Sequence, residues 1–489
     1  MSFSVLRAAV EAPRRLALLV DGREITFAEL AVDVRRAMAW LVEGHGKKGG
    51  TSTEKNGGTS TGGALTEKKG GTPWVALVGD GRYATLVTLY ALIELGWPAV
   101  LVHPRWTDDE ARRWLGRSVP WAERTRPWSP DAEAAAAVVE PPAVADDERP
   151  LAVVATSGSS GAPKAVVLSR RALAAGARAS AANLGWHDDD RWLLSLAVAH
   201  VGGLAILLRS LAARRAVVVE NHRRFDAARI ADAVGERRVT LLSLVPAMLQ
   251  RLLRLDPPWR PPAHLRAILL GGAAASPTLR AAAAARGWPV LVTYGLTEAG
   301  SQVATQPYAT RGQPAPGCGP PLPGIEVRID DGVIALRGAT LFSTYLPQDP
   351  AHPPFDAGGW FVTGDRGWLD AAGNLHLLGR ADEVIITGGE NVDPLEVERV
   401  LEDHPRIEEA CVFGVADDEW GQVVAAALVA AEPPADGELV RHCEKTLAPF
   451  KRPRRLAYLP SLPHTATGKV DRRAAAALAR ALLRPLAPG

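Results

Sequence analysis

Short apolar runs alternate with helix-like segments along most of this 489-residue chain, and this alternation restricts the fold more than any other feature. The expected strands lie at residues 75–78, 99–102, 151–155, 165–168, 192–196, 239–244, 267–270 and 289–294. Helices are expected between them, opening near Thr26, Ser169, Pro246 and Ser276 and covering 86–95 and 203–211. Strands that alternate with helices predict parallel sheets covered on both faces. We therefore expect an α/β fold.

Composition excludes several classes of protein. With 47% hydrophobic and 22% charged residues, the chain is predicted to be soluble and to form more than one domain. Lys and Arg total 56 against 54 for Asp and Glu, which gives a nucleic-acid partner no support. The cysteines Cys318, Cys411 and Cys443 are too far apart for a disulfide framework or a zinc site, and they suit a reducing cytoplasm. The most apolar run, 86–102, is interrupted by charge, glycine and proline, so no membrane span is expected.

Residues 47–72 form a low-complexity segment. The sequence KKGGT occurs at 47–51 and 68–72, and GGTST occurs at 49–53 and 57–61. Such a segment buries too little apolar surface to offset the entropy lost on ordering, so we expect a disordered loop. A tether or docking segment is the alternative interpretation.

The nine residues from Thr156 to Lys164 have the composition of a phosphate-binding loop. They are Thr156, Ser157, Gly158, Ser159, Ser160, Gly161, Ala162, Pro163 and Lys164. Free backbone N–H groups and hydroxyls can surround a phosphate, and the Lys164 ammonium adds positive charge. The run does not match the Walker A pattern G-x-x-x-x-G-K-[ST], and a strand rather than the helix of that motif is expected after Lys164. A flexible surface turn is the alternative.

Two further motifs follow expected strands: Gly271-Gly272-Ala273 and Tyr294-Gly295-Leu296-Thr297-Glu298. In α/β folds ligands lie beyond the carboxyl ends of the strands, so both motifs are candidates for one site. Glu298 and Thr297 could hold Mg²⁺ and a phosphate oxygen, and Tyr294 could stack on a base. An ordinary polar turn is the alternative.

The remaining charged candidates lie in the last third of the chain. Asp365 ends the glycine-rich run 359–365, and Arg380 and Asp382 follow within 379–382. A carboxylate beside glycines suits the two hydroxyls of a ribose. Lys469 ends the run 464–469. A lone lysine after a glycine is most often a solvated surface residue, and that alternative stays open here.

Taken in their order, these stretches resemble the motifs of the acyl-adenylate-forming superfamily, and the chain is similar to its acyl-CoA synthetases. The resemblance covers the chain apart from the low-complexity segment, and residues 388–391 with Pro394 and Glu398 extend it into a small C-terminal domain. Two positions depart from the family pattern. Ala165 stands where glycine is usual and is expected to cost some freedom of the loop. Asp393 stands where an aromatic or aliphatic residue is common and is expected to cap a helix that begins at Pro394.

The resemblance implies three parts. These are a large N-terminal domain of parallel-rich sheets layered with helices over 1–379, a hinge at 380–382, and a small mobile α+β domain over 383–489. It also implies an AMP-forming acid–thiol ligase that uses ATP, Mg²⁺ and coenzyme A. In such enzymes a carboxylate attacks the α-phosphate of ATP and gives an acyl-adenylate and pyrophosphate. The coenzyme A thiol then displaces AMP.

The resemblance further implies residue roles. Lys469 supplies positive charge at the α-phosphate, Thr297 contacts that phosphate, and Glu298 binds Mg²⁺. Asp382 is the hinge about which the C-terminal domain turns. The implied ATP- and AMP-binding set is Thr156, Ser157, Gly158, Ser159, Ser160, Gly161, Lys164, Gly271, Gly272, Ala273, Tyr294, Gly295, Leu296, Asp365 and Arg380. The implied coenzyme A-binding set is Gly388, Gly389 and Glu390.

The acid substrate is expected near His200 and Gly203, in the run 196–204, and near Ser301 and Gln302. A histidine in an apolar run is as often a satisfied core residue, but the motif favours a gating role. These runs, and the compact length once 49–72 is set aside, resemble the 2-succinylbenzoate–CoA ligases of menaquinone biosynthesis. We therefore expect a cytoplasmic enzyme with a small-molecule carboxylic acid as partner, and a homo-oligomer stays open. The alternatives are another aryl- or fatty-acyl-CoA ligase, a peptide-synthetase adenylation module and a non-catalytic nucleotide-binding homologue.

Overall fold

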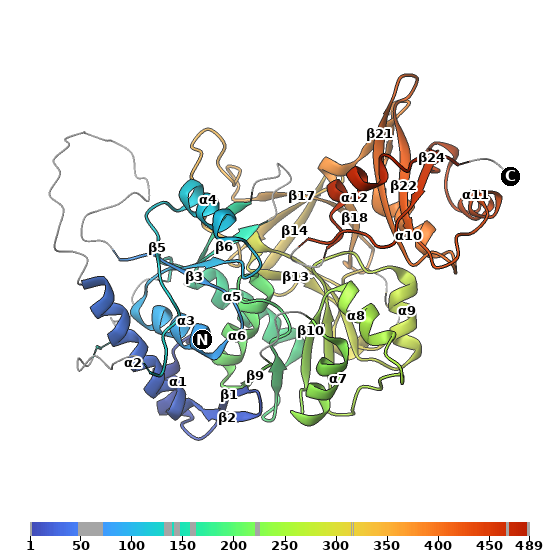
Figure 1. The fold of residues 1–489 in the computed structure, drawn as a ribbon. Helices are drawn as coiled ribbons and strands as arrows, with labels where there is room; N and C mark the ends of the chain where they lie inside the picture. The colour runs from blue at the N-terminus through green and yellow to red at the C-terminus, as the bar shows by residue number, and fades with distance from the viewer. Residues whose placement is uncertain are drawn as a thin grey trace.

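The computed structural model describes residues 2–46, 72–131, 139–140, 147–156, 163–220, 225–313, 315, 317–465 and 469–486. The expected disordered segment falls almost wholly on 47–71, outside these residues, as do Ser157, Gly158, Ser159, Ser160 and Gly161 of the phosphate loop. Thr72, at the end of that segment, is described, and its hydroxyl accepts a hydrogen bond from Arg149 at 2.7 Å. Figure 1 shows a large N-terminal part and a smaller C-terminal part beside it.

The first sheet of the described chain has eight strands. Their order is β13 (Ser301–Thr305), β12 (Val290–Leu296), β11 (Ala267–Leu270), β10 (Leu241–Leu244), β8 (Arg191–Leu193), β9 (Ala216–Val219), β1 (Leu16–Val20) and β2 (Arg23–Thr26). The interior pairs are parallel, and only the two edge pairs, β1–β2 and β12–β13, are antiparallel. The carboxyl ends of the parallel strands therefore meet along one edge.

The second sheet has six strands in the described residues. Their order is β16 (Thr344–Leu346), β7 (Lys164–Ser169), β6 (Pro150–Thr156), β4 (Ala99–Val102), β3 (Val75–Val78) and β5 (Glu123–Arg124). The hairpin β6–β7 is antiparallel and carries the phosphate loop at its turn. Ala165 lies within β7, fully buried and paired with Ala155 and Leu346. The replacement of the usual glycine by alanine therefore restricts the backbone of a strand and not that of the loop.

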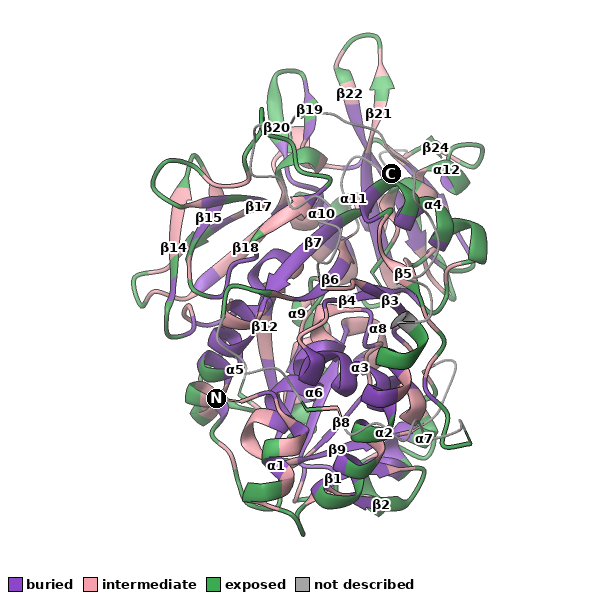
Figure 2. Cartoon of the chain, turned by 90° about the vertical axis from the view of Figure 1, so that its left-hand side faces the viewer, coloured by how far each residue is buried: buried purple, intermediate pink, exposed green. Residues whose placement is uncertain are grey.

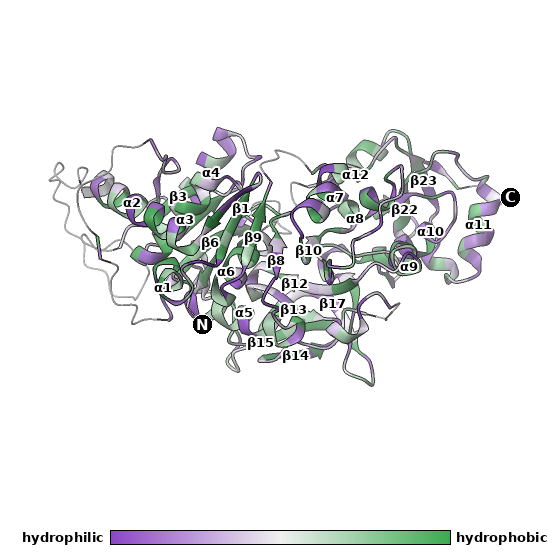
Figure 3. Ribbon diagram, turned by 90° about the horizontal axis from the view of Figure 1, so that it is seen from below, coloured by the Kyte–Doolittle hydropathy of each residue, from purple (hydrophilic) through white to green (hydrophobic). Residues whose placement is uncertain are grey.

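Helices cover both sheets. They are α1 (Val5–Glu11), α2 (Phe27–Gly46), α3 (Tyr83–Leu95), α4 (Asp108–Ser118), α5 (Arg170–Leu184), α6 (Val201–Ala213), α7 (Ala227–Glu236), α8 (Pro246–Leu253) and α9 (Pro277–Ala285). Residues of α3 and α6 share one core with strands of both sheets, and α3 is buried from Thr85 to Leu95. A helix that is apolar all round must be buried in this way. Figure 3 shows hydrophobic colour on these strands and helices.

Helix starts follow the expected caps. Ser169 accepts from the Ala172 amide, and Ser276 accepts from the Leu279 amide. Thr26 and Glu29 exchange the reciprocal hydrogen bonds of a capping box. The ends of the strands agree less well with the expected strands at 192–196 and 239–244. Strand β8 already ends at Leu193, and β10 begins only at Leu241.

Two further groups of strands follow. The first is an antiparallel sheet of β14 (Ile325–Asp330), β15 (Val333–Gly338), β17 (Phe361–Leu369) and β18 (Leu375–Arg380), which sequence analysis missed. The C-terminal part contains β19 (Ile385–Thr387), β20 (Glu390–Val392), α10 (Pro394–Glu402), β21 (Glu409–Asp417), β22 (Gly421–Val429), α11 (Asp436–Glu444), β23 (Arg455–Tyr458), α12 (Arg472–Ala479) and β24 (Arg484–Pro485). It has cores of its own, as expected for an α+β unit. The expected fold class is thereby confirmed.

No helix in the described ranges combines the length and the apolar character that a membrane crossing needs.

Candidate functional site

Residues from separate motifs meet at the carboxyl ends of the strands. Tyr294, on β12, donates its hydroxyl proton to Asp365 Oδ2 across 2.7 Å, and Asp365 lies on β17. The Tyr294 side chain is buried, and burial together with the neighbouring carboxylate raises its pKa well above the usual value. Tyr294 thus stays protonated and holds Asp365 in place.

Arg380 forms the centre of an ion-pair cluster. The β17–β18 register places Asp365 opposite Arg380, and Arg380 Nη1 lies 3.3 Å from Asp365 Oδ1. Arg380 Nε donates to Asp382 Oδ1 at 2.9 Å. Burial alone would lower the pKa of Arg380, but the hydrogen bond to Asp382 and the charges of both carboxylates raise it. The guanidinium therefore stays charged and links the ends of two motifs.

Glu298 lies in a short 3₁₀ turn, η1 (Thr297–Ala299), that follows β12. Its Oε1 accepts the Tyr345 hydroxyl at 2.9 Å, and the Lys164 ammonium lies 4.8 Å from the centre of the Tyr345 ring. Burial raises the pKa of the Glu298 carboxyl, while the Tyr345 hydrogen bond and the Lys164 charge oppose the rise. Sequence analysis missed Tyr345, which β16 brings beside β7 by antiparallel pairing.

A magnesium site here fits the donor set. Mg²⁺ commonly takes one or two carboxylates and completes its shell with water and phosphate oxygens. Glu298 is a buried carboxylate beside the Lys164 end of the phosphate loop. Among the described residues no three acidic, His or Cys side chains form a preformed metal cage. Glu298 therefore suits a metal shared with a phosphate ligand.

Lys469 reaches this cluster from the C-terminal part. Thr465 N donates to Lys469 O at 2.7 Å, and Lys469 N donates to Thr465 Oγ1 at 3.2 Å, so pairing with Thr465 fixes the backbone of the lysine. Desolvation by the surrounding protein lowers the pKa of the ammonium, although Lys469 as a residue is exposed. The charges of Asp365, Glu298 and Glu383 oppose that shift, and the charge of Arg380 adds to it. The Lys469 ammonium therefore lies within electrostatic range of the Asp365 and Glu298 carboxylates.

The glycines of these motifs have clear packing reasons. A Cβ on Gly271 would lie 2.6 Å from Thr293 Cγ2, and a Cβ on Gly295 would lie 2.0 Å from Ser301 O. Gly272 has φ +81° and so occupies the left-handed region. Leu296 ends β12 and Ala273 follows Gly272 beyond β11, so all five positions lie at the strand ends as expected.

His200 lies on the same edge, one residue before α6. Its Nε2 is 3.1 Å from His103 Nε2, in the segment that follows β4. Gly203 allows the preceding turn to close, because a Cβ there would lie 2.2 Å from Ala197 O. Sequence analysis missed His103, although its place directly after an expected strand was a usable signal.

Ser301 and Gln302 begin β13. Ser301 has φ +117°, an unusual backbone conformation outside glycine. Gln302 is buried, and its Nε2 donates to Thr305 Oγ1 at 2.8 Å, while Oε1 has no partner among the described residues. Gln302 is thus tied into the β12–β13 pair.

The coenzyme A candidates lie apart from the other motifs. Gly388 and Gly389, both with positive φ, form the turn between β19 and β20. Glu390 is the first residue of β20. A Cβ on Gly388 would lie 2.6 Å from the Trp420 ring. Figure 2 shows this hairpin projecting from the surface. Among the described residues, no hydrogen bond or ion pair joins this turn to the cluster around Asp365.

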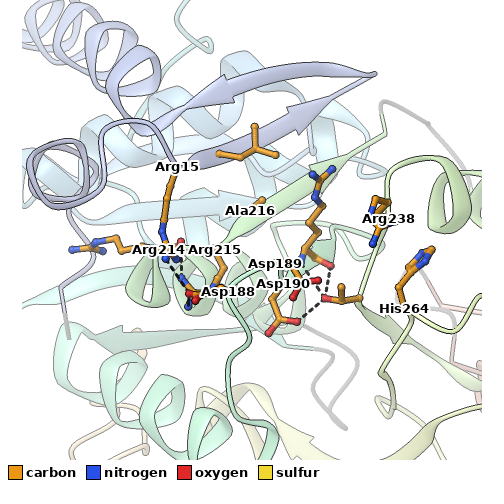
Figure 4. A pocket seen from close by; sticks show the side chains of 12 residues that line it. Arg15, Asp188, Asp189, Asp190, Arg214, Arg215, Ala216, Arg238 and His264 are labelled. Carbon is orange, nitrogen blue, oxygen red and sulfur yellow. Dashed lines mark hydrogen bonds and ion pairs between the residues drawn. The ribbon is translucent and has the colours of Figure 1, made fainter.

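A charged pocket of about 180 Å³ lies elsewhere, where β8 and β9 begin (Figure 4). Its charges largely compensate each other: Asp188 pairs with Arg15 and Arg215, both at 2.9 Å. Asp190 is held by Arg266 at 2.6 Å. The pocket contains none of the motif residues, so the carboxyl edge is the candidate site.

Two family models match the chain. The AMP-binding enzyme model covers residues 117–346, and the model of the AMP-binding enzyme C-terminal domain covers 396–469. A 2-succinylbenzoate–CoA ligase of Listeria monocytogenes serotype 4b (strain F2365) is 32% identical, over 94% of this chain and 96% of the relative. The corresponding protein of Bacillus pumilus (strain SAFR-032) is 30% identical over 96% of each chain.

Solved structures of o-succinylbenzoate CoA synthetase (MenE) from Bacillus subtilis are similar to this fold. The complex with the acyl-adenylate intermediate OSB-AMP has a TM-score of 0.83, 30% identity and 96% coverage of both chains. A double mutant of that enzyme, bound with the product analogue OSB-NCoA, has a TM-score of 0.68 at 30% identity and 99% coverage of both chains.

Proposed function

Because this chain belongs to the AMP-binding enzyme family, we propose that it is an AMP-forming carboxylic acid–CoA ligase that acts on 2-succinylbenzoate. One observation carries the proposal: two 2-succinylbenzoate–CoA ligases match at least 94% of the chain at 30% identity or more. The geometry supports it, since Lys469, Asp365, Arg380 and Glu298 gather at one edge.

The first half-reaction brings a carboxylate towards the α-phosphate of ATP. Two anions meet, so preorganised positive charge lowers the barrier most effectively. In our proposal Lys469 supplies that charge at the α-phosphate, and the 156–164 loop with Lys164 holds the β- and γ-phosphates. Thr297 would contact the α-phosphate. Glu298 would hold Mg²⁺, which when bound neutralises charge on the phosphate oxygens.

Asp365 is proposed to bind the ribose. Its two oxygens already accept from Tyr294 and Arg380, but a carboxylate has about four acceptor positions, so hydroxyl groups can add to those bonds. Tyr294 then serves first to orient Asp365. The adenine is proposed to lie beside the Tyr294 ring and the Gly271–Ala273 backbone, with Gly295 and Leu296 at its edge.

The second half-reaction is proposed to need rotation of residues 383–489 about a hinge at 380–382, against a domain of residues 1–379. The pairing pattern supports this boundary. Arg380 binds Asp365 and Asp382, whereas the next acidic residue, Glu383, binds Arg472 of α12 at 3.1 Å. The OSB-NCoA complex matches this fold with a lower TM-score than the OSB-AMP complex, although the coverage is higher. This difference supports a second arrangement of the C-terminal part relative to the N-terminal part. Rotation would withdraw Lys469 and bring Gly388, Gly389 and Glu390 towards coenzyme A.

The acid is proposed to lie near His200, Gly203, Ser301 and Gln302. The decisive experiment measures AMP formation with coenzyme A over a panel of acids. We expect 2-succinylbenzoate to give the highest kcat/KM. Efficient turnover of benzoate or a medium-chain fatty acid, with none of 2-succinylbenzoate, would refute the substrate. We further propose a cytoplasmic location, which the three buried free cysteines support.

A further inference from the structure

Two imidazoles face each other beside the proposed acid site. His103 follows β4 of the six-stranded sheet, and His200 precedes α6, which packs between the two sheets. The ring centres are 4.8 Å apart and the planes are inclined by 45°, so the rings meet through their Nε2 atoms, 3.1 Å apart, and are not stacked. One Nε2 must therefore carry a proton and the other must accept it.

The backbone decides which ring donates. His103 Nδ1 lies 3.1 Å from the backbone nitrogen of Arg105, and an amide N–H can only donate. His103 Nδ1 is therefore the acceptor, and the single proton of a neutral His103 is on Nε2. That proton points to His200 Nε2, which must be unprotonated. A neutral His200 then carries its proton on Nδ1.

Both rings are neutral near pH 7. Burial lowers the pKa of His103 to about 4, the Arg105 charge adds to the shift, and Glu110 on α4 opposes it. Burial likewise lowers the pKa of His200 to about 4, and His103, Lys469 and Arg105 add to that shift. Within the described residues His200 Nδ1 has no hydrogen-bond partner.

We propose that His103 is a positioning residue, which fixes His200 in the tautomer with its proton on Nδ1 and so presents a neutral N–H donor to the carboxyl group of the bound acid. In the opposite tautomer a nitrogen lone pair would face the carboxylate oxygens and repel them. The relay runs from the Arg105 amide through His103 to His200. Its role in acid binding rests on the proposed function, whereas the tautomer assignment does not.

The tautomer is tested on the full chain without substrate. The protein is labelled with ¹⁵N-histidine, and the His200 nitrogens are assigned by loss of their signals in His200→Gln. We expect a protonated Nδ1 and an unprotonated Nε2. His103→Asn keeps an oxygen that can accept from the Arg105 amide but is too short to reach His200, so His200 should shift towards the Nε2–H form. His103→Gln is long enough to donate to His200 Nε2 and should restore the original spectrum.

The same variants are then assayed by pyrophosphate release at saturating ATP, with the acid that the wild-type protein uses best. His103→Asn should raise KM for the acid roughly two- to tenfold, the range that one net hydrogen bond supports, and leave KM for ATP unchanged. His103→Gln should remain near the wild type. The matched control is His352→Gln, because His352 is an exposed residue whose ring pairs with Asp349, likewise exposed. This control should change neither constant.

Several results would overturn the inference. A His200 that is protonated on Nε2 in the wild type refutes the relay, as does an unchanged His200 spectrum in His103→Asn. A changed spectrum with an unchanged KM for the acid refutes the role in binding. A protein that turns over no acid refutes the proposed function instead, and the nitrogen spectra still decide the tautomer.

Discussion

Asp393 is a buried carboxylate at the junction between the C-terminal part and β17–β18. The residue is 7% exposed, Oδ1 accepts from the Leu395 amide at 3.2 Å, and Oδ2 has no hydrogen-bond partner in the described residues. A Cβ on Gly379 of β18 would lie 2.4 Å from Oδ1, and Arg366 of β17 lies 3.9 Å from Oδ2. Docking on these two strands therefore desolvates the carboxylate.

Burial raises the pKa of Asp393 from 3.8 to about 6, against the opposing Leu395 amide and the charges of Arg366 and Arg399, while Glu396 adds to the rise. The folded form therefore favours the protonated carboxyl. Its contribution to stability is complete below pH 3.8 and is lost as the pH rises through 6. A shift of about two pKa units corresponds to about 3 kcal/mol.

Asp393→Asn removes this titration and keeps a residue that caps helices well. The stability of the variant relative to the wild type should therefore rise by up to about 3 kcal/mol between pH 4 and pH 7, and then level off. Thermal unfolding of both proteins at a series of pH values measures this relative stability. The difference in Tm between variant and wild type should change by several degrees between pH 4 and pH 7. Asp418→Asn, an exposed carboxylate of the β21–β22 turn, is the control and should give a flat difference.

A Tm difference that is independent of pH would refute the reasoning, as would an Asp393→Asn protein that is less stable than the wild type only at pH 8. Either result would show that the carboxylate is paired or solvated when ionised.

Three further predictions address the half-reactions and the low-complexity segment. Lys469→Ala should lose adenylation by about 10²–10³-fold, as for loss of one preorganised donor, but keep thioester formation from supplied acyl-adenylate. Asp382→Pro should keep adenylation but lose thioester formation, since a fixed φ hinders rotation. Equal losses in both assays would contradict the role of Lys469 or of Asp382, whichever residue is changed. Deletion of 49–72 should leave Tm and turnover nearly unchanged, because the described part of that segment contributes only the exposed Arg149–Thr72 hydrogen bond. A large loss of either would mean that the segment packs or docks.

The parallel sheets could be predicted because their strands are buried on both faces. The runs 75–78, 99–102 and 267–270 coincide with β3, β4 and β11. The antiparallel sheet could not be predicted so easily, since strands such as β14 consist mostly of half-exposed or exposed residues and have no continuous apolar run. Alternating or mixed exposure leaves only a weak pattern in the sequence.

The site divides in a similar way. Asp365, Arg380, Glu298 and Lys469 lie in contiguous motifs that could be recognised along the chain. Tyr345 lacks such a motif, because its place beside Glu298 depends on pairing between β16 and β7, far apart in sequence. The place of His103 directly after a strand is visible in the sequence, but its pairing with His200 depends on the packing of α6 between the two sheets. Partners set by tertiary register, such as Tyr345 for Glu298, leave no local pattern.

The contacts that hold the C-terminal part in its present place are consistent with the proposed rotation. Arg254 pairs with Glu408 at 2.9 Å, and the Thr278 hydroxyl donates to Asp403 at 2.9 Å; both are exposed contacts. A half-buried hydrogen bond, from Arg399 Nη2 to the Leu377 carbonyl at 2.8 Å, also joins the two parts. Exposed ion pairs contribute about 0–1 kcal/mol each, so breaking them costs little. The buried, ionised Asp393 destabilises the docked arrangement at neutral pH, and rotation away from Gly379 would return it to water. The proposed mechanism needs a docked state that can be released, because Lys469 would have to leave before the thiol enters. Asp393→Asn should therefore favour the docked state and slow thioester formation more than adenylation.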